Sequence, residues 1–451
     1  MRRILIAGTN SGCGKTTITC AILAALKKRG SRVSSFKCGP DYIDPMFHRE
    51  IIGVPSYNLD SFFCDDATLK YLMYEHSSDS DISVVEGVMG FYDGEERGTS
   101  SHSLSLMTNT PAVIVIDCKG MSDSVGAVMR GFLEYKRPNN IAGFIFNRLS
   151  DKLTGLAQKL CSDLGTQYLG YFPKSAITLE SRHLGLVTAS ETDNIKEKLG
   201  KLGETAEKCI AIDSIMSIPE REFPAFTAPS FPKKDGEGPV IAVARDNAFC
   251  FIYEDNIELL KKLGCEICFF SPLSDRKMPE NAAGLLLCGG YPELYAAQLS
   301  ANKEMLADIR GKLHSGLPVI AECGGFMYLH DTFEDMDNRE HTGVGAVRGK
   351  AFRTEKLQRF GYVTMTAEND NLICKAGEKI RAHEFHYFDS TNCGNCFVAA
   401  GTYGRTWECV HADDHFYAGF PHLYFYADMR IAERFVNACR CYMENKTDDR
   451  N

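Results

Sequence analysis

The chain opens with MRRILIAGTNSGCGKTTITC (residues 1–20), and this stretch decides the fold of the first half. The apolar run from Ile4 to Ala7 leads into a glycine-rich turn, and Lys15 begins a segment of helical pattern. A strand, a glycine-rich turn and a helix in this order cradle phosphate groups, because backbone N–H groups and the helix N-terminus face the anion. The stretch therefore predicts a nucleotide-binding P-loop.

The spacing of this loop differs by one residue from the common P-loop pattern. Counting back from Gly14, the first glycine is expected at residue 9, which is Thr9, whereas Gly8 makes the loop one residue longer. In such loops the lysine reaches the β and γ phosphates and the hydroxyl after it ligates Mg²⁺. The predicted nucleotide-binding residues are Gly8, Thr9, Gly12, Gly14, Lys15, Thr16 and Thr17.

The composition excludes several classes of protein. The chain has 451 residues, 44% hydrophobic and 24% charged, which suits two or three globular domains. A net charge of -9 without any run of five basic residues argues against nucleic-acid binding. No stretch of eighteen apolar residues occurs, so we expect no membrane span and a cytoplasmic location, where the 18 cysteines would be thiols.

Two regions of alternating strand and helix patterns predict two α/β domains. Short β-branched runs recur up to about residue 190, which indicates a parallel sheet buried on both faces, with a first helix from Thr16 to Arg29. The stretch from Ile218 to Pro239 carries five of the sixteen prolines and little periodicity. The alternation restarts at Val240. The predicted division is a first domain over 1–218, a linker over 219–239 and a second domain over 240–451.

Acidic residues follow two of the predicted strands of the first domain. KCGPDYIDPMFH (37–48) places Lys37 at the end of a strand, with Asp41 and Asp44 in the turn after it. DISVVEGVMGFYDG (81–94) places Glu86 at the end of a buried strand and Asp93 in the loop beyond. Charges at the carboxyl ends of parallel strands face the ligand crevice, and Glu86 stands where a metal-binding carboxylate is expected. The alternative is that these acids are solvated loop charges.

The second domain contains a candidate nucleophile. GLPVIAECGGFMYL (316–329) predicts a strand, a sharp turn holding Cys323, and a helix whose N-terminus would lower the thiol pKa. Residues 289–291 (GGY), which follow the predicted strand in GLLLCGGYPELY (284–295), offer N–H groups for an oxyanion hole. Gly290 and Gly324 are the candidates. His422, in YAGFPHLYFYA (417–427), is the candidate base. The alternatives are a small buried cysteine and a core histidine.

Taken together, these motifs resemble the cobyrinate a,c-diamide synthase family, within the wider group that includes dethiobiotin synthetase and cobyric acid synthase. The matching stretches, in family order, are GTNSGCGKTT, KCGPDYIDPMFH, SYNLDSFF, EGVMGFYDG, CGGYPELY, ECGGFMYL, HEFHYFD and HLYF. The longer P-loop is typical of this group. The resemblance implies a dethiobiotin-synthetase-like P-loop domain followed by a class I type glutamine amidotransferase domain.

The resemblance also implies the chemistry and the site residues. It implies ATP- and Mg²⁺-dependent phosphorylation of corrinoid acetate groups, with glutamine as the ammonia source, and we consider a homodimer as the assembly. The implied metal ligands are Thr16, Asp44 and Glu86, and the implied substrate-binding residues are Lys37, Asp41, Tyr42 and Asp93. Cys323 would form the thioester, with His422 as base and then acid. Related glutaminases often carry a glutamate two residues after this histidine, but here the position is Tyr424, so the residue that orients His422 is not identified.

Several alternatives remain open from the sequence. Two C-x-x-C pairs occur, one formed by Cys265 and Cys268 and the other by Cys393 and Cys396. The motif HEFHYFD (383–389) groups two histidines with acids. Each of these features could suggest a metal site. Nickel-sirohydrochlorin or hydrogenobyrinate are alternative substrates to cobyrinate. More distant alternatives are a P-loop switch ATPase and an iron–sulfur scaffold ATPase.

Overall fold

The computed structural model describes residues 1–174, 189–231, 237–402 and 404–448. The chain divides into two compact units, Met1–Pro229 and Ser230–Asn451. The division falls within the predicted linker 219–239, of which residues 232–236 lie outside the described residues. Within the described ranges, no helix is long and apolar enough to cross a membrane. All 18 cysteines are free thiols.

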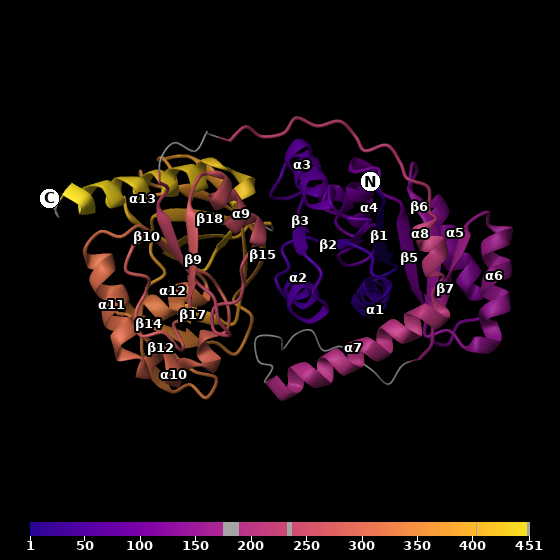
Figure 1. Cartoon of the computed structure of the whole chain (residues 1–451), viewed down its shortest axis with the longest axis horizontal. Coiled ribbons are helices and arrows are strands. Elements are labelled where there is room, and N and C mark those ends of the chain that lie inside the picture. Colours follow the sequence, from indigo (N-terminus) through magenta and orange to yellow (C-terminus); the bar gives the residue numbers. More distant parts are fainter. Residues whose placement is uncertain (175–188, 232–236, 403, 449–451) are drawn as a thin grey trace. The chain divides into compact units, whose positions relative to one another are not determined.

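Unit 1 is built on a seven-stranded parallel sheet with the order β3-β2-β4-β1-β5-β6-β7 (Figure 1). Its strands are β1 (Arg3–Gly8), β2 (Val33–Cys38), β3 (Ser56–Leu59), β4 (Ile82–Glu86), β5 (Ala112–Asp117), β6 (Ile141–Asn147) and β7 (Gln167–Phe172). Its helices are α1 (Lys15–Lys28), α2 (Ile43–Phe47), α3 (Asp66–Ser77), α4 (Ser101–Met107), α5 (Ser124–Glu134), α6 (Thr154–Asp163), α7 (Ala189–Cys209) and α8 (Ile212–Met216).

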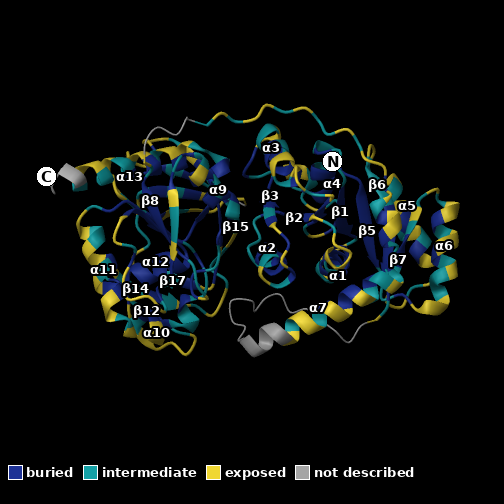
Figure 2. Cartoon of the chain, viewed as in Figure 1, coloured by how far each residue is buried: buried dark blue, intermediate teal, exposed yellow. Residues whose placement is uncertain are grey.

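The central strands of this sheet are buried, as their continuous apolar runs predict. Every residue of β1, β2 and β4 is buried, and Figure 2 shows β1 and β5 in the colour of buried residues. The predicted α/β class and parallel sheet are confirmed. Strands β3 and β7 were not predicted from the sequence, because β3 has only four residues and β7 is a partly exposed edge strand that contains a glutamine and a glycine.

The order of the strands gathers the functional motifs of unit 1. Strand β4 lies between β2 and β1, and in this register Glu86 is opposite Lys37 on one side and Ile6 on the other. Because all three strands are parallel, their carboxyl ends meet at one edge of the sheet. The P-loop after β1, the turn after β2 and the loop after β4 therefore lie side by side.

The first part of the predicted linker packs on unit 1. The Arg3 guanidinium donates hydrogen bonds to the carbonyls of Arg221 and Glu222, at 3.2 and 3.1 Å, and lies over the ring of Phe223. The ring of Phe226 contacts Tyr74 on α3, with 5.4 Å between ring centroids. Residues just after Ile218 are thus anchored to the first unit although they have no helix or strand.

Unit 2 contains three sheets. The largest has the order β20-β21-β11-β10-β8-β9 and is parallel except for the β20–β21 pair. Its strands are β8 (Val240–Ala244), β9 (Glu266–Phe270), β10 (Ala282–Leu287), β11 (Val319–Glu322), β20 (His411–Ala412) and β21 (Phe416–Gly419). The four-stranded sheet comprises β12 (His330–Glu334), β13 (Glu340–Thr342), β14 (Val347–Arg353) and β17 (Phe388–Ser390). The five-stranded sheet comprises β15 (Arg359–Ala367), β16 (Lys379–His386), β18 (Phe397–Gly401), β19 (Thr406–Cys409) and β22 (His422–Leu423).

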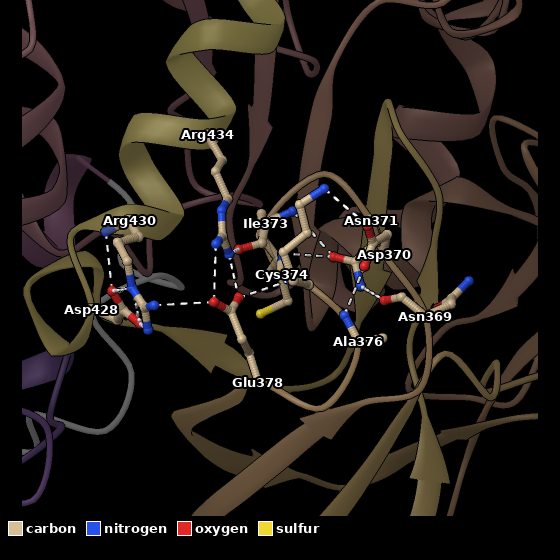
Figure 3. A network of polar contacts seen from close by, with 11 residues as sticks. Asn369, Asp370, Asn371, Ile373, Cys374, Ala376, Glu378, Asp428, Arg430 and Arg434 are labelled. Atoms are coloured by element: carbon tan, nitrogen blue, oxygen red, sulfur yellow. Dashed lines mark hydrogen bonds and ion pairs between the residues drawn. The ribbon is translucent and has the colours of Figure 1, made fainter.

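The described helices of unit 2 end with a long C-terminal helix. They are α9 (Glu254–Lys262), α10 (Ala296–Ala301), α11 (Lys303–His314), α12 (Gly324–Leu329) and α13 (Arg430–Asp448). Figure 3 shows how charged side chains fasten α13 to the loop before β16: Glu378 accepts hydrogen bonds from Arg434 and Arg430. Arg434 also donates to the Ile373 carbonyl at 3.0 Å.

Candidate active sites

The glycine-rich loop of unit 1 uses contacts and conformations that only glycine permits. Gly14 precedes α1 with φ of 98°, and a Cβ there would lie 2.2 Å from the side-chain nitrogen of Asn147. A Cβ on Gly8 would lie 2.2 Å from Cys13 Sγ. Asn147, at the end of β6, donates its amide to the Cys13 carbonyl at 2.7 Å. Strand β6 therefore supports the loop that presents the N-terminus of α1 to a phosphate.

Lys15 lies between the P-loop and the loop after β4. Its side chain is buried, and its ammonium donates to the carbonyls of Asn10, at 3.1 Å, and Met89. Burial lowers the pKa of Lys15. In the loop after β4, the exposed Asp93 accepts a hydrogen bond from the Gly90 N–H at 2.7 Å. The two loops thus place a cation and a carboxylate at the same edge of the sheet.

Thr16, Lys37, Asp44 and Glu86 converge in one buried cluster. The Thr16 hydroxyl donates to Glu86 Oε1 at 2.6 Å, and Lys37 Nζ lies 2.9 Å from the same oxygen and 2.5 Å from Asp44 Oδ2. Burial and the charge of Asp44 raise the pKa of Glu86 to about 7, against the opposing effect of Lys37. Burial disfavours the charged lysine, but Glu86 and Asp44 outweigh it and raise the pKa of Lys37. The structure thus brings the three predicted metal-site residues together: Asp44 and Glu86 contact one ammonium, and Thr16 bonds to Glu86.

The other two predicted substrate-binding residues lie at the start of α2. Asp41 accepts hydrogen bonds from the N–H groups of Ile43, at 2.8 Å, and Asp44, at 3.2 Å, and its other oxygen is 3.8 Å from Lys37 Nζ. Tyr42 precedes the helix and is partly buried. Asp41 therefore holds the turn that carries Asp44, in addition to facing Lys37.

His48 was not singled out from the sequence, although it ends the motif KCGPDYIDPMFH. It is fully buried, its Nε2 lies 3.6 Å from Glu86 Oε2, and its Nδ1 contacts the hydroxyls of Ser35 and Ser56 at 3.1 and 3.3 Å. Burial lowers the pKa of His48 to about 4, so the ring is neutral near pH 7. Only the folded structure reveals that His48 is a neighbour of Glu86, because the two residues are far apart in the sequence and come together through the pairing of β2 with β4.

In unit 2, Cys323 occupies the strained turn that the sequence predicts. It lies between β11 and α12 with φ of 47° and ψ of -104°, and its N–H donates to the Gly419 carbonyl at 2.8 Å. A Cβ on Gly325 would lie 2.0 Å from the Leu287 carbonyl oxygen, so the following turn needs glycine. A non-glycine residue at positive φ is uncommon and is tolerated where the surrounding structure imposes it. This is the geometry of a nucleophile held at a strand-to-helix turn.

His422 lies next to this cysteine. A Cβ built on Gly289 would be 2.5 Å from His422 Cε1 and 3.5 Å from Cys323 Cβ, so both side chains border the same point. Burial alone would lower the pKa of His422, but its charge interaction and hydrogen bond with Cys323, together with Glu322, raise it to about 10. A protonated imidazole beside a thiol is the arrangement that stabilises a thiolate. The structure therefore brings the predicted nucleophile and base together.

The two predicted oxyanion-hole residues are also adjacent. A Cβ on Gly324 would lie 3.1 Å from the Gly290 backbone nitrogen, and a Cβ on Gly290 would lie 2.2 Å from the Ala248 carbonyl oxygen. Gly324 is the first residue of α12, where the N–H group has no acceptor within the helix. Two backbone donors thus border the nucleophile.

A carboxylate on the other side of His422 was missed in the sequence analysis. Glu322 Oε2 lies 3.4 Å from His422 Nδ1, and Glu322 Oε1 accepts the Leu423 N–H at 3.2 Å. Tyr424 occupies the position where related glutaminases often carry glutamate, and its hydroxyl donates to Asp255 Oδ2 at 2.8 Å. The signal that could have identified Glu322 is an acidic residue ending a buried apolar strand, next to the nucleophile.

The remaining motifs take other contacts. His383 of HEFHYFD is paired with His422 in the β16–β22 register, and His386 Nε2 contacts Glu384 Oε2 at 2.7 Å. Cys393 Sγ contacts Asp389, and the Cys396 thiol contacts a backbone carbonyl. Within the described part of the chain, no three His, Cys, Asp or Glu side chains form a metal-binding group.

Family models match both units. Residues 4–186 match the CobQ/CobB/MinD/ParA nucleotide binding domain, and residues 240–428 match the CobB/CobQ-like glutamine amidotransferase domain. The two matches cover the P-loop with its acidic cluster and the Cys323–His422 pair, respectively.

Curated relatives match along nearly the whole chain. A cobyrinate a,c-diamide synthase of Caldanaerobacter subterraneus is 38% identical over 98% of this chain and 99% of its own length. Proteins of the same name from Priestia megaterium and Fusobacterium nucleatum are 35% and 37% identical over 99% and 96% of this chain, and over 99% of their own lengths. With full-length similarity and both domains present, the chain belongs to the cobyrinate a,c-diamide synthase family of glutamine-dependent amide ligases.

Proposed function

We infer that this protein uses ATP to amidate the a and c acetate carboxylates of cobyrinate with ammonia released from glutamine, in cobalamin biosynthesis. The observation that carries this proposal is the presence, in one chain, of the P-loop with its buried acidic cluster and of the Cys323–His422 pair. The curated relatives matched over nearly their full length carry this activity in their names.

The synthetase half must activate a carboxylate that does not react with ammonia by itself. An oxygen of the acetate group attacks the γ-phosphorus of ATP, ADP leaves, and an acyl phosphate forms; ammonia then attacks the acyl carbon and phosphate leaves. In this proposal Lys15 and the N–H groups of the P-loop hold the transferred phosphate. Lys37, Asp41, Tyr42 and Asp93 border the edge where the acetate would lie. Two rounds consume two ATP and two glutamine.

The residues of the acidic cluster fit Mg²⁺. Thr16 supplies a hydroxyl, Asp44 and Glu86 supply carboxylates, and the buried Glu86 Oε2 accepts no hydrogen bond from the described residues. Mg²⁺ is commonly bound by one or two carboxylates together with substrate phosphates. When bound, the ion would neutralise charge on the phosphate oxygens. Lys37 keeps the two carboxylates close together by compensating their charge.

The glutaminase half uses the pair in unit 2. The Cys323 thiolate attacks the amide carbon of glutamine, and Gly290 and Gly324 donate to the oxygen of the tetrahedral intermediate. His422 then gives a proton to the departing ammonia, a thioester remains, and His422 removes a proton from the water that hydrolyses it.

A homodimer and a cytoplasmic location stay predictions.

The test is a mass-spectrometric assay with amide-¹⁵N glutamine, ATP and Mg²⁺. Cobyrinate, hydrogenobyrinate and nickel-sirohydrochlorin are offered in parallel, and Cys323→Ala is the matched variant. We expect ¹⁵N-labelled diamide from cobyrinate, lost in the variant and restored by free ammonia. Preferential labelling of another tetrapyrrole would identify that compound as the substrate in place of cobyrinate. ATP hydrolysis without any labelled amide would refute the ligase and favour the P-loop switch.

A further inference from the structure

Glu322 joins the nucleophile turn to the segment that carries the base. It is the last residue of β11, directly before Cys323, and both it and His422 are buried. One of its oxygens faces His422 Nδ1 at 3.4 Å and the other accepts the Leu423 N–H at 3.2 Å. A single carboxylate therefore contacts both residues of the short strand β22.

The neighbouring residues have other partners. Tyr424 is turned toward Asp255, and Asn256 donates to the Leu423 carbonyl and accepts from the Phe425 N–H, at 2.9 and 2.8 Å. These contacts from α9 fix the backbone after His422 without supplying a carboxylate to its ring. Glu322 is the acidic side chain that forms an ion pair with His422 in the described residues.

We propose that Glu322 is the residue that orients His422 for glutamine hydrolysis, replacing the glutamate that related glutaminases carry two positions after the histidine. This inference rests on the proposed roles of Cys323 and His422. In this proposal the Glu322 carboxylate, which lies 3.4 Å from Nδ1 as an ion pair, favours the ring with its proton on that nitrogen and so leaves Nε2 for the thiol. Glu322 is a positioning residue, since it acts through His422.

The other titratable groups around the imidazole do not duplicate this role. His383 faces His422 from β16, with 6.5 Å between ring centroids, and burial lowers the pKa of His383 to about 3, so it is neutral. Cys288 and Tyr417 lie near Glu322, and burial raises the pKa of each, so both stay protonated near neutral pH. Interactions with Cys323 and Glu322 are therefore what raises the pKa of His422.

The experiment measures glutamine hydrolysis by the full-length protein without a corrin acceptor, so it does not depend on the substrate of unit 1. In Glu322→Gln the amide keeps an acceptor for the Leu423 N–H but can donate to Nδ1 and stabilise the wrong tautomer. We expect kcat to fall on the order of 10²-fold, the lower range of general acid–base effects, with KM for glutamine changed less than about threefold. The alkaline limb of the pH profile of kcat/KM should move to lower pH.

Matched variants separate this role from a purely structural one. Tyr424→Phe removes a buried hydrogen bond of the same segment, and it should keep the wild-type pH profile. Wild-type kcat and pH profile in Glu322→Gln would overturn the proposal. If Glu322→Gln does not fold, as judged by thermal unfolding, Glu322→Asp decides: its shorter carboxylate should lower kcat by more than about tenfold, and an unchanged kcat would overturn the proposal.

Cys323→Ala distinguishes the two levels of inference. If this variant hydrolyses glutamine at the wild-type rate, the proposed glutaminase site is wrong and the role of Glu322 fails with it. If Cys323→Ala is inactive while Glu322→Gln behaves as wild type, only the positioning role of Glu322 fails.

Discussion

Lys37 and Glu86 are direct partners in the parallel register of β2 and β4, and Lys37 Nζ lies 2.9 Å from Glu86 Oε1. Both side chains are buried, and Asp44 faces the same ammonium. One buried cation thus holds together two carboxylates that would otherwise repel each other at the edge of the P-loop.

Removing this cation should destabilise unit 1 strongly. Lys37→Met leaves Asp44 and Glu86 buried without their partner, and breaking a buried ion pair costs about 3–5 kcal/mol. Urea unfolding followed by circular dichroism measures the loss. Lys159→Met is the control, because the Lys159–Asp163 pair is exposed and such pairs contribute about 0.3–0.5 kcal/mol. Equal losses in the two variants would contradict this account of the cluster.

Gly14→Ala should weaken nucleotide binding strongly. The residue has φ of 98°, and an added Cβ would lie 2.2 Å from Asn147, so the loop must shift away from the N-terminus of α1. Titration with a fluorescent ATP analogue measures the affinity, which we expect to fall more than about 100-fold, equivalent to roughly 2.7 kcal/mol. Gly131→Ala, in α5 with open space around its Cβ, should bind as wild type. Unchanged affinity in Gly14→Ala would mean that this loop does not hold the phosphates.

The raised pKa of His422 predicts a pH dependence of the stability of unit 2. A histidine whose folded pKa is about 10, against an ordinary pKa of 6.5, binds more protons in the folded state between these values. Its stabilising contribution is therefore complete below about pH 6.5 and is lost as pH rises toward 10. Urea unfolding at several pH values measures the free energy of unfolding, which should decline less over this window in His422→Gln than in the wild type. His415→Gln, at an exposed position, should keep the wild-type decline.

The ion pairs between Glu378 and α13 predict a modest contribution to stability. This contribution is lost as the pH falls, whereas that of His422 is lost as the pH rises. Hydrogen bonds from Arg434 and the Lys375 N–H lower the pKa of Glu378 to about 2, from an ordinary pKa of 4.5. Its contribution is present above about pH 4.5 and is lost as pH falls toward 2. Glu378→Gln should therefore cost about 0.5–1 kcal/mol at pH 7, since exposed pairs contribute little. A loss that stays the same at pH 3 would contradict the electrostatic origin.

Much of the fold follows from local sequence pattern. The runs RILIAG, VIVID and FIFN are continuous and apolar because their strands are buried on both faces, and they predict a parallel sheet without knowledge of tertiary contacts. Gly8, Gly14 and Lys15 are close in the sequence, so their spacing alone predicts a phosphate-binding turn. Cys323 is likewise recognisable, because the sharp turn and its glycines are adjacent residues.

Other features depend on pairings between distant segments. Strand β3 is too short to give a periodic signal, and its place at the edge of the sheet depends on β2. His48 reaches Glu86 only because β2 and β4 are neighbours. Spacing in the chain carries no information about such contacts, since the order of strands in a parallel sheet is set by the crossover connections.

The sequence by itself determined the α/β class, the P-loop and the sharp turn that holds Cys323, the predicted nucleophile, because each is encoded in consecutive residues with distinctive backbone requirements. Only the tertiary structure decided which carboxylate faces His422. Glu322 Oε2 and His422 Nδ1 are 3.4 Å apart, although many helices and strands separate the two residues in the sequence. Packing of the β11 end against β22 creates that contact, and no local pattern specifies it.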